Sequence, residues 1–313
     1  MTATVHLHWG ADALWQQLQP LLPGLSVEVV ARVESTNTVL LERARVLGGA
    51  RDARISRPGE LDSAGVGGPT PLGRRGADVQ PCLLVAEQQT RGRGRLGRDW
   101  VSSTGASLTF SLALPLAPAD WSGLSLAVGL ALAEALEPLP SLSDADADTS
   151  LPPRLQLKWP NDLWFVEDPT APGRGRKLGG ILIETVSVGQ RRMCVVGVGL
   201  NVLPQPVPDF PHGYASLQEL QPGIGAPAVL ARVAEPLVRA LLDFQARGFA
   251  PLVAAYARRD LLRGQAVTTT QADVPAGVAD GVDERGALRV LAGGVHLVVS
   301  GEVSVRLDPA APA

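Results

Sequence analysis

Alternating and continuous apolar stretches divide the chain into strands and helices. They predict strands at 25–33, 81–89, 106–116, 155–159, 177–188 and 191–202. The last two are separated by Gly189 and Gln190 alone, which predicts a hairpin. Apolar residues at helical spacing predict helices at 38–48, 123–137 and 226–262, the last with a kink or break at Pro236. Together these elements predict an α+β fold, in which a mixed β-sheet carries helices on one face.

The chain changes character near residue 263. The segment 263–313 contains short apolar runs separated by turn residues, which predicts a small β-barrel of its own. We therefore expect a larger domain at 1–262 and a smaller one at 263–313. Residues 48–80 are rich in Gly, Arg, Asp and Pro without periodicity, so they predict a flexible insertion. Segments 140–153 and 167–176 are expected to be surface loops.

Composition and charge narrow the class of protein. Hydrophobic residues make up 45% and charged residues 19% of the chain, as in soluble globular proteins. The net charge of −3 argues against general binding of polyanions. Cys82 and Cys194 lie in apolar runs, which indicates reduced core residues. The N-terminus lacks a signal-peptide pattern and the longest apolar run is too short to span a membrane, so we expect a cytoplasmic protein.

The segment 90–100, "TRGRGRLGRDW", interrupts this pattern with four arginines among three glycines. Glycine lets the backbone approach a ligand closely, and the planar guanidinium suits phosphate or carboxylate. A solvated loop and an RGG-like nucleic-acid segment are alternatives. The segment is not a Walker A loop, because no Gly-Lys-Ser/Thr follows.

Three further segments place polar residues at strand ends. In "KWPNDLW" (158–164), Pro160 forces a turn, and Lys158 and Asp162 could meet a phosphate and an attacking amine. In "RKLGGILIE" (176–184), Lys177 opens a strand. In "VGVGLNV" (196–202), Asn201 is a polar residue in an apolar strand and needs a hydrogen-bond partner. Each segment alone also fits a plain turn or a solvated strand end.

The order "ESTN", "EQQTRGRGRLGRDW", "KWPNDLW", "RKLGGILIE", "VGVGLN" closely resembles the biotin–protein ligase family, over residues 25–307. "GEVSVR" (301–306) resembles the end of the family's small SH3-like β-barrel. The resemblance implies a mixed-sheet catalytic domain of the biotin/lipoate ligase type. It also implies that ATP and Mg²⁺ activate biotin to biotinoyl-5′-AMP. The biotinoyl group then passes to one lysine of a biotin carboxyl-carrier protein, such as that of acetyl-CoA carboxylase.

The resemblance also assigns residues. Lys177, Arg95 and Asp162 are expected to be catalytic, with Asp162 orienting or deprotonating the incoming amine. The expected biotin-binding residues are Ser35, Thr36, Asn37, Gln89, Arg93, Gly94, Arg95 and Lys177. The expected ATP and adenylate contacts are Arg93, Arg95, Trp100, Lys158, Asn161, Lys177 and Asn201. Asn201 is also the candidate Mg²⁺ ligand, and Trp159 is a core residue or a second aromatic wall.

Some features depart from the family pattern or leave rivals open. About 25 residues precede the first strand, too few for the winged helix-turn-helix of bifunctional members, so no specific DNA binding is expected. Leu96 stands where some relatives have another arginine. A homodimer is possible. One alternative is a lipoate–protein ligase, but its substrate lacks the ureido ring that "STN" and "GRGR" suit. The others are a nucleic-acid-binding module that uses the Arg/Gly segment, and a degenerate ligase that binds biotin without turnover.

Overall fold

The computed structural model describes residues 7–55, 79–140, 152–169, 175–205, 213–300 and 305–307. Most of the predicted insertion at 48–80 lies outside the described residues, as do parts of the predicted loops at 140–153 and 167–176. Residues 301–304 of the "GEVSVR" motif also lie outside them. The start of the insertion differs from the prediction, because the helix that begins at Thr36 continues to Ile55.

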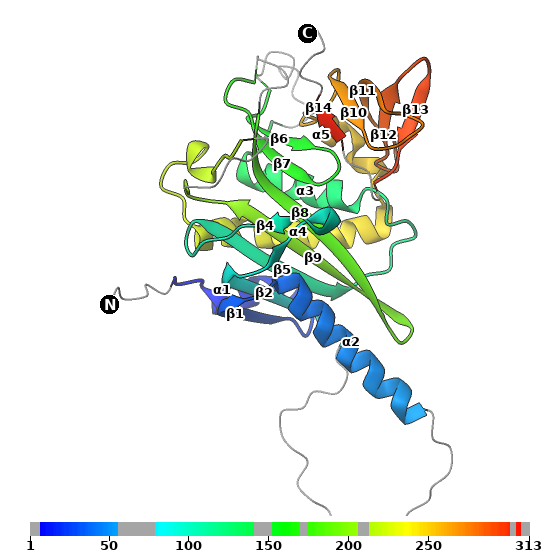
Figure 1. Cartoon of the computed structure of the whole chain (residues 1–313). Coiled ribbons are helices and arrows are strands. Elements are labelled where there is room, and N and C mark those ends of the chain that lie inside the picture. The colour runs from blue at the N-terminus through cyan, green and yellow to red at the C-terminus, as the bar shows by residue number, and fades with distance from the viewer. Residues whose placement is uncertain are drawn as a thin grey trace, which may run out of the picture.

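A seven-stranded mixed sheet forms the centre of the molecule (Figure 1). Across the sheet, the strands are β1 (Ser26–Val33), β2 (Cys82–Gln89), β5 (Ser107–Pro115), β9 (Arg191–Asn201), β8 (Arg176–Val188), β7 (Asp162–Phe165) and β6 (Leu155–Lys158). β1 and β2 run parallel, and the other neighbours are antiparallel. The mixed sheet is therefore confirmed, and the hairpin at Gly189–Gln190 joins β8 to β9 as predicted.

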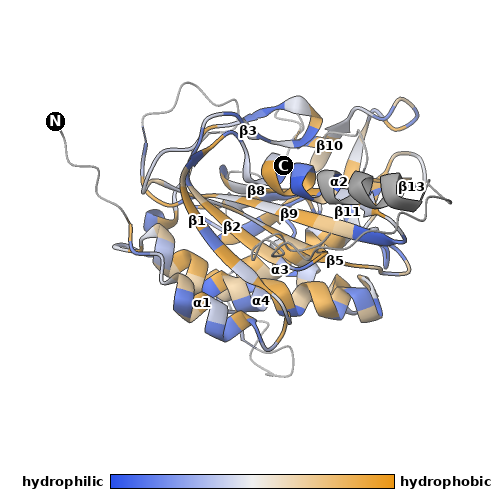
Figure 2. Cartoon of the chain, turned by 90° about the horizontal axis from the view of Figure 1, so that it is seen from below, coloured by the Kyte–Doolittle hydropathy of each residue, from blue (hydrophilic) through white to orange (hydrophobic). Residues whose placement is uncertain are grey.

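Helices cover both faces of this sheet, which corrects the prediction of one covered face. The helices are α1 (Ala11–Leu18), α2 (Thr36–Ile55), α3 (Leu124–Leu136), α4 (Ala226–Arg247) and α5 (Val253–Ala257). α1, α3 and α4 lie beneath the sheet and α2 above it (Figure 2). The strand alternation explains this, because Leu83 and Val85 point into the large core while Leu84 packs with Leu40 and Leu41 of α2. The helix does not break at Pro236, since α4 continues through it, and a kink there stays a prediction.

The C-terminal strands form a separate antiparallel sheet. In spatial order they are β13 (Val295–Val298), β12 (Leu288–Leu291), β11 (Ala276–Val282), β10 (Ala266–Thr269) and β14 (Val305–Leu307). Within the described residues β13 and β14 are its two edges and do not pair with each other, so a closed barrel is not confirmed. The division into domains at residue 263 stays a prediction.

A buried hydrogen bond and an exposed ion pair join the two sheets. Trp159 is fully buried and its indole N–H donates to the carbonyl of Gly286 at 3.0 Å, so Trp159 is a core residue. Arg285 pairs with Asp120 at 2.8 Å across the same junction. Cys82 and Cys194 are buried and not joined to each other, as predicted. In the part of the chain that the structure describes, no helix has the length and hydropathy needed to cross a bilayer.

Candidate active site

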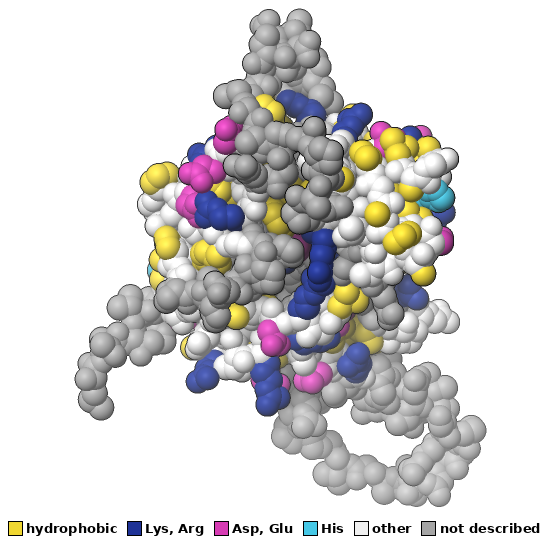
Figure 3. All heavy atoms as spheres, turned by 45° about the horizontal axis from the view of Figure 1, so that its top comes forward, with side chains coloured by type: hydrophobic (Ala, Val, Ile, Leu, Met, Phe, Trp, Pro, Cys, Tyr) yellow, Lys and Arg dark blue, Asp and Glu magenta, His cyan; other side chains and the backbone are white. Residues whose placement is uncertain are grey.

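A cavity of about 410 Å³ opens on the sheet face that carries α2. One 3₁₀ turn and a short ribbon complete its surroundings: η1 (Arg95–Gly97), β3 (Gly92–Arg93) and β4 (Asp99–Trp100). Figure 3 shows Lys and Arg side chains gathered near the centre of this face. The sequence-predicted residues that line the cavity are Ser35, Thr36, Asn37, Gln89, Arg93, Gly94, Arg95, Trp100, Asn161, Asp162, Lys177 and Asn201. The structure thus brings together every predicted site residue except Lys158.

One end of the cavity is polar but uncharged, and it is built on the start of α2. Ser35 caps the helix, accepting the Thr38 N–H at 3.4 Å. The Thr36 backbone N–H donates to Gln89 Oε1 at 2.7 Å, which joins the helix to the end of β2. Ser35, Thr36 and Asn37 are all buried. These groups therefore form a fixed hydrogen-bonding surface rather than a solvated loop.

Asn37 reaches the sheet because Gly197 leaves room for it. A Cβ on Gly197 would lie 2.2 Å from Asn37 Oδ1, closer than any side chain permits. The Asn37 amide donates to the Leu182 carbonyl at 3.1 Å and to Glu184 Oε2 at 3.0 Å. The first glycine of "VGVGLN" thus permits the contact between α2 and β8.

The arginine segment folds back over the cavity as a short ribbon. β3 pairs with β4, and Gly94 N–H donates to the Arg98 carbonyl at 2.7 Å. Arg93 pairs with Glu184 at 3.1 Å and also donates to Thr38 Oγ1 at 3.3 Å. Leu96 stands at the tip in the left-handed region (φ 57°) and is exposed. The segment is therefore held across the cavity by contacts with α2 and β8.

Trp100 forms an aromatic wall against a second glycine. A Cβ on Gly199 would lie 2.5 Å from the indole ring, so only glycine allows the ring to rest on β9. The Trp100 indole N–H is buried and has no hydrogen-bond partner among the described residues. A ligand oxygen could accept this hydrogen bond.

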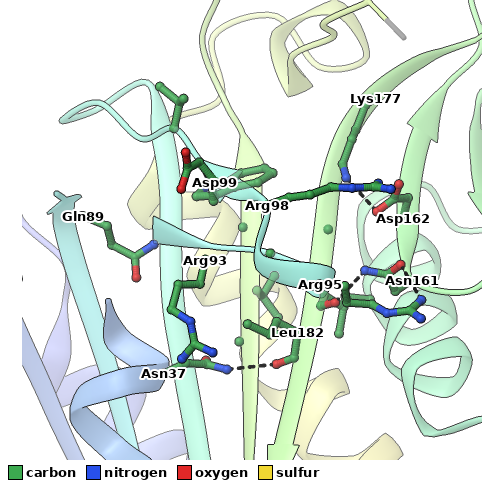
Figure 4. Close-up of a pocket in the computed structure, with 18 of the residues that line it drawn as sticks. Asn37, Gln89, Arg93, Arg95, Arg98, Asp99, Asn161, Asp162, Lys177 and Leu182 are labelled. Atoms are coloured by element: carbon green, nitrogen blue, oxygen red, sulfur yellow. Dashed lines mark hydrogen bonds and ion pairs between the residues drawn. The ribbon is translucent and has the colours of Figure 1, made fainter. Parts of the chain in front are cut away.

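The other end of the cavity is cationic. Lys177 Nζ lies 2.8 Å from Asp162 Oδ1, and Figure 4 shows Arg98 extending toward this pair. Arg95 donates to Asn161 Oδ1 at 3.2 Å. Burial lowers the pKa of the Arg95 guanidinium from its usual value, a shift that the charge of Asp162 opposes. Three cations and one carboxylate therefore face one space, an arrangement suited to an anionic ligand.

Asn201 lines the cavity, and its amide nitrogen is engaged by the backbone, so its predicted contact with phosphate or Mg²⁺ stays a prediction for the amide oxygen. Its amide N–H groups donate to the carbonyls of Lys177 at 3.3 Å and Ala215 at 3.1 Å. The Lys177 carbonyl also accepts the Ala215 N–H at 3.0 Å. Asn201 therefore finds the partner that its burial requires and holds the backbone that carries Lys177.

Lys158 differs from its predicted role as an ATP contact, because it does not line the cavity. It is 7% exposed, its ammonium donates to the Val305 carbonyl of β14 at 2.8 Å, and it lies 5.4 Å from the centre of the Trp164 ring. Burial lowers its pKa from 10.5 to about 8, although the charge of Asp162 acts in the opposite direction. Lys158 thus ties the C-terminal sheet to the strand that leads into the Asn161–Asp162 turn.

Sequence reasoning missed several residues of the site. Arg98, Tyr214 and Arg306 line the cavity, while Glu184 holds both Asn37 and Arg93. Arg98, Glu184 and Arg306 stand inside the quoted motifs, but no role was assigned to them. Tyr214 has no local signal, because only tertiary contacts bring it there.

The described residues contain no cluster of three or more His, Cys, Asp or Glu side chains that could hold a metal ion. The arrangement can nevertheless bind a molecule with a hydrogen-bonding head and an anionic end. It can also stabilise negative charge beside Lys177, Arg95 and Arg98.

Comparisons with known proteins agree on a single relationship. Residues 79–201 match the Biotin/lipoate A/B protein ligase family. The chain is 32% identical over 302 residues to the biotin–[acetyl-CoA-carboxylase] ligase of Mycobacterium tuberculosis, covering 93% of this chain and 89% of the relative. It is 30% identical over 298 residues to the bifunctional ligase/repressor BirA of Escherichia coli, covering 93% and 77% respectively.

Solved structures give the same result. The biotin protein ligase from Aquifex aeolicus in complex with biotin and ATP superposes with a TM-score of 0.63 at 26% identity. The match covers 90% of this chain and 99% of that structure.

The contact between Gly199 and Trp100 gives a first prediction. Gly199→Ala should lower the free energy of unfolding by about 1–3 kcal/mol, because the added methyl group must displace the indole. Gly294→Ala is the control, since a Cβ there meets no atom within 4 Å, and it should change stability by less than about 0.5 kcal/mol. Urea unfolding measures both variants. Equal stability of the two would contradict the packing described for Trp100.

The burial of Lys158 gives a second prediction. Lys158 and Lys177 are the only lysines in the chain, so labelling lysine Cε with ¹³C gives two NMR signals. One signal should titrate near pH 8, since burial lowers the pKa of Lys158 to about 8. A Lys177→Arg variant retains that signal and assigns it.

The lowered pKa of Lys158 also determines how the stability of the fold changes with pH. Between about pH 8 and 10.5 the folded chain has lost the Lys158 proton that the unfolded chain retains, so the contribution of Lys158 to stability rises with pH. If no lysine signal moved near pH 8, Lys158 would not be buried as described.

Proposed function

The chain belongs to the biotin protein ligase family, and from this premise we propose that it joins biotin to a lysine of an acceptor protein, using ATP. In the first step the biotin carboxylate attacks the α-phosphorus of ATP. The bond to the β-phosphate breaks, and biotinoyl-5′-AMP and pyrophosphate form. In the second step a neutral lysine amine attacks the acyl carbon, AMP leaves and the amine gives up a proton.

The observation that carries this proposal is the division of one cavity into two chemically different ends. The uncharged end, with Thr36 and Gln89, suits a cyclic urea, which has two N–H donors and one carbonyl acceptor. The cationic end, with Arg95, Arg98 and Lys177, suits the carboxylate and the phosphates. The volume of about 410 Å³ falls within the range of small-molecule sites.

Lys177 is assigned the stabilisation of negative charge, and Asp162 the orientation and deprotonation of the incoming amine. The Lys177 ammonium offsets the repulsion between the carboxylate and the α-phosphate, and then the charge that develops during transfer. In the free site, the Asp162 carboxylate accepts a hydrogen bond from the Lys177 ammonium, with 2.8 Å between Oδ1 and Nζ. When the anionic ligand engages Lys177, the Asp162 carboxylate becomes able to orient the incoming amine and accept its proton.

The second candidate, a lipoate–protein ligase, is disfavoured by the uncharged end. A dithiolane ring has neither an N–H donor nor a carbonyl acceptor. The polar groups around Thr36 and Gln89 would then lose water without gaining a hydrogen bond from the ligand, which a site built for hydrogen bonds penalises strongly. A nucleic-acid-binding module is disfavoured because the arginines of 91–98 are folded over this cavity, where Arg93 is paired with Glu184.

Mg²⁺ is proposed as a companion of ATP. This ion is held mainly by phosphate oxygens and water and takes few protein ligands in such sites. Asn201 stays the proposed protein ligand, because it lines the cavity and its amide nitrogen, not its oxygen, is engaged by backbone carbonyls. When bound, the ion neutralises charge on the triphosphate, and Lys177, Arg95 and Arg98 face what remains.

The acceptor that we propose is a biotin carboxyl-carrier domain, in keeping with the name of the M. tuberculosis relative. Specific DNA binding is not part of the proposal, although the E. coli relative is named a ligase and repressor. A cytoplasmic location and a homodimer also stay proposals.

Removing the central cation tests the proposed activity. Lys177→Ala should slow pyrophosphate release from biotin and ATP by about a hundredfold or more, because one preorganised cation is lost at the reacting centre. Intact mass of an added carrier domain should show one biotinoyl group with the unmodified enzyme and none with the variant. Omission of ATP should also abolish the shift.

Arg239→Ala is the matched control, since it removes an exposed cation of α4 whose ion pair within the described residues is with nearby Glu235. It should leave both readouts unchanged. Modification of the carrier by lipoate and not biotin would move the chain to the neighbouring activity. Full activity of Lys177→Ala would contradict the assigned role.

A further inference from the structure

A buried serine lies directly behind the uncharged end of the cavity. Ser111 of β5 is 0% exposed and is not among the residues that line the cavity. Its hydroxyl oxygen lies 2.6 Å from Thr36 Oγ1 and 2.6 Å from Asn37 Oδ1. Both contacts are short enough to require a proton between the two oxygens. Ser111 has one proton to supply, so the positions of the other protons can be derived.

The Asn37 amide fixes the first proton. Its nitrogen faces the Leu182 carbonyl at 3.1 Å and Glu184 Oε2 at 3.0 Å, and both of these are acceptors. If the amide were flipped, its oxygen would face the Leu182 carbonyl and the Glu184 carboxylate, which are both acceptors. The amide oxygen, Oδ1, must therefore be the atom that faces Ser111. An amide oxygen carries no proton. The Ser111 hydroxyl therefore donates to Asn37 Oδ1.

The second contact then fixes Thr36. Since the Ser111 proton is engaged, the 2.6 Å contact requires the Thr36 hydroxyl to donate to Ser111 Oγ. Thr36 Oγ1 also lies 3.1 Å from Gln89 Oε1, but its single proton is required by the shorter 2.6 Å contact with Ser111 Oγ. Thr36 Oγ1 therefore presents only lone pairs to the cavity that it lines.

We propose that Ser111 is a positioning residue which fixes the Thr36 hydroxyl as a hydrogen-bond acceptor, so that the site selects a ligand with an N–H donor at this point. The inference rests on the proposed function, in which the cyclic urea of biotin supplies that N–H. Ser111 acts through Thr36 and Asn37 and does not touch the ligand. Figure 4 shows Asn37, one of its two partners, bonded to the Leu182 carbonyl at the foot of the cavity.

The experiment measures equilibrium binding of biotin and of two cyclic carbamate analogues, in which one or the other ureido N–H is replaced by oxygen. The unmodified protein should bind one analogue about a hundredfold more weakly than biotin, because an oxygen would meet the lone pairs of Thr36. In Ser111→Ala the Thr36 hydroxyl can rotate and donate. Biotin should then bind about tenfold more weakly, and the discrimination against that analogue should fall by at least about tenfold.

Ser107→Ala is the control variant. Ser107 is a buried serine on the same strand, and its hydroxyl accepts from Gln205 and from the Ser103 N–H instead of contacting Thr36. It should keep the discrimination of the unmodified protein. An equal loss of affinity for biotin and both analogues in Ser111→Ala would overturn the inference, since it would show a structural role alone.

Two further outcomes need no variant, so poor folding of Ser111→Ala does not remove the test. Equal binding of biotin and both analogues by the unmodified protein would overturn the inference while leaving the proposed function intact. Absence of biotin binding by the unmodified protein would overturn the proposed function and the inference with it.

Discussion

The site depends on one requirement: every polar group placed on the face of the sheet that α2 covers needs a hydrogen-bond partner. α2 begins over the sheet because Ser35 caps it there and because Gly197 leaves space for Asn37. Asn37 then bonds to β8 through its nitrogen and to β5 through its oxygen. An unpaired amide at this depth would cost about 1–3 kcal/mol, so the helix start and the two strands are fixed together.

The same network connects the two ends of the cavity. Glu184 accepts from Asn37 and pairs with Arg93 at 3.1 Å, which holds the arginine segment over the uncharged end. At the cationic end, Asn201 holds the backbone of Lys177, while Lys158 ties the C-terminal sheet to the Asn161–Asp162 turn. Groups that contact the ligand are thus supported by buried groups that do not, which keeps their positions fixed before the ligand arrives.

The sequence predicted the strands of the central sheet well, because long apolar runs bounded by turns depend on local patterning. It also placed the correct segments around one site, since motifs such as "ESTN" and "KWPND" carry their chemistry locally. The sequence indicated that Asn201 needs a partner, but it could not identify that partner or predict the burial of Lys158, because their partners lie on other elements. Ser111 and Glu184 escaped notice for the same reason, as their partners on α2 are more than 70 positions away. The short β7 strand and the position of α2 on the opposite face also follow from tertiary packing alone.

The uncharged end of the cavity should recognise a cyclic urea. Titration calorimetry of the purified chain with biotin and with lipoate, each without ATP, measures this selectivity. Biotin should bind at one site per chain, and lipoate should bind at least about a hundredfold more weakly because its ring gives the polar groups of this end no hydrogen bond. Equal affinity for the two acids would contradict the account, because it would show that the Thr36, Asn37 and Gln89 network takes no part in recognition.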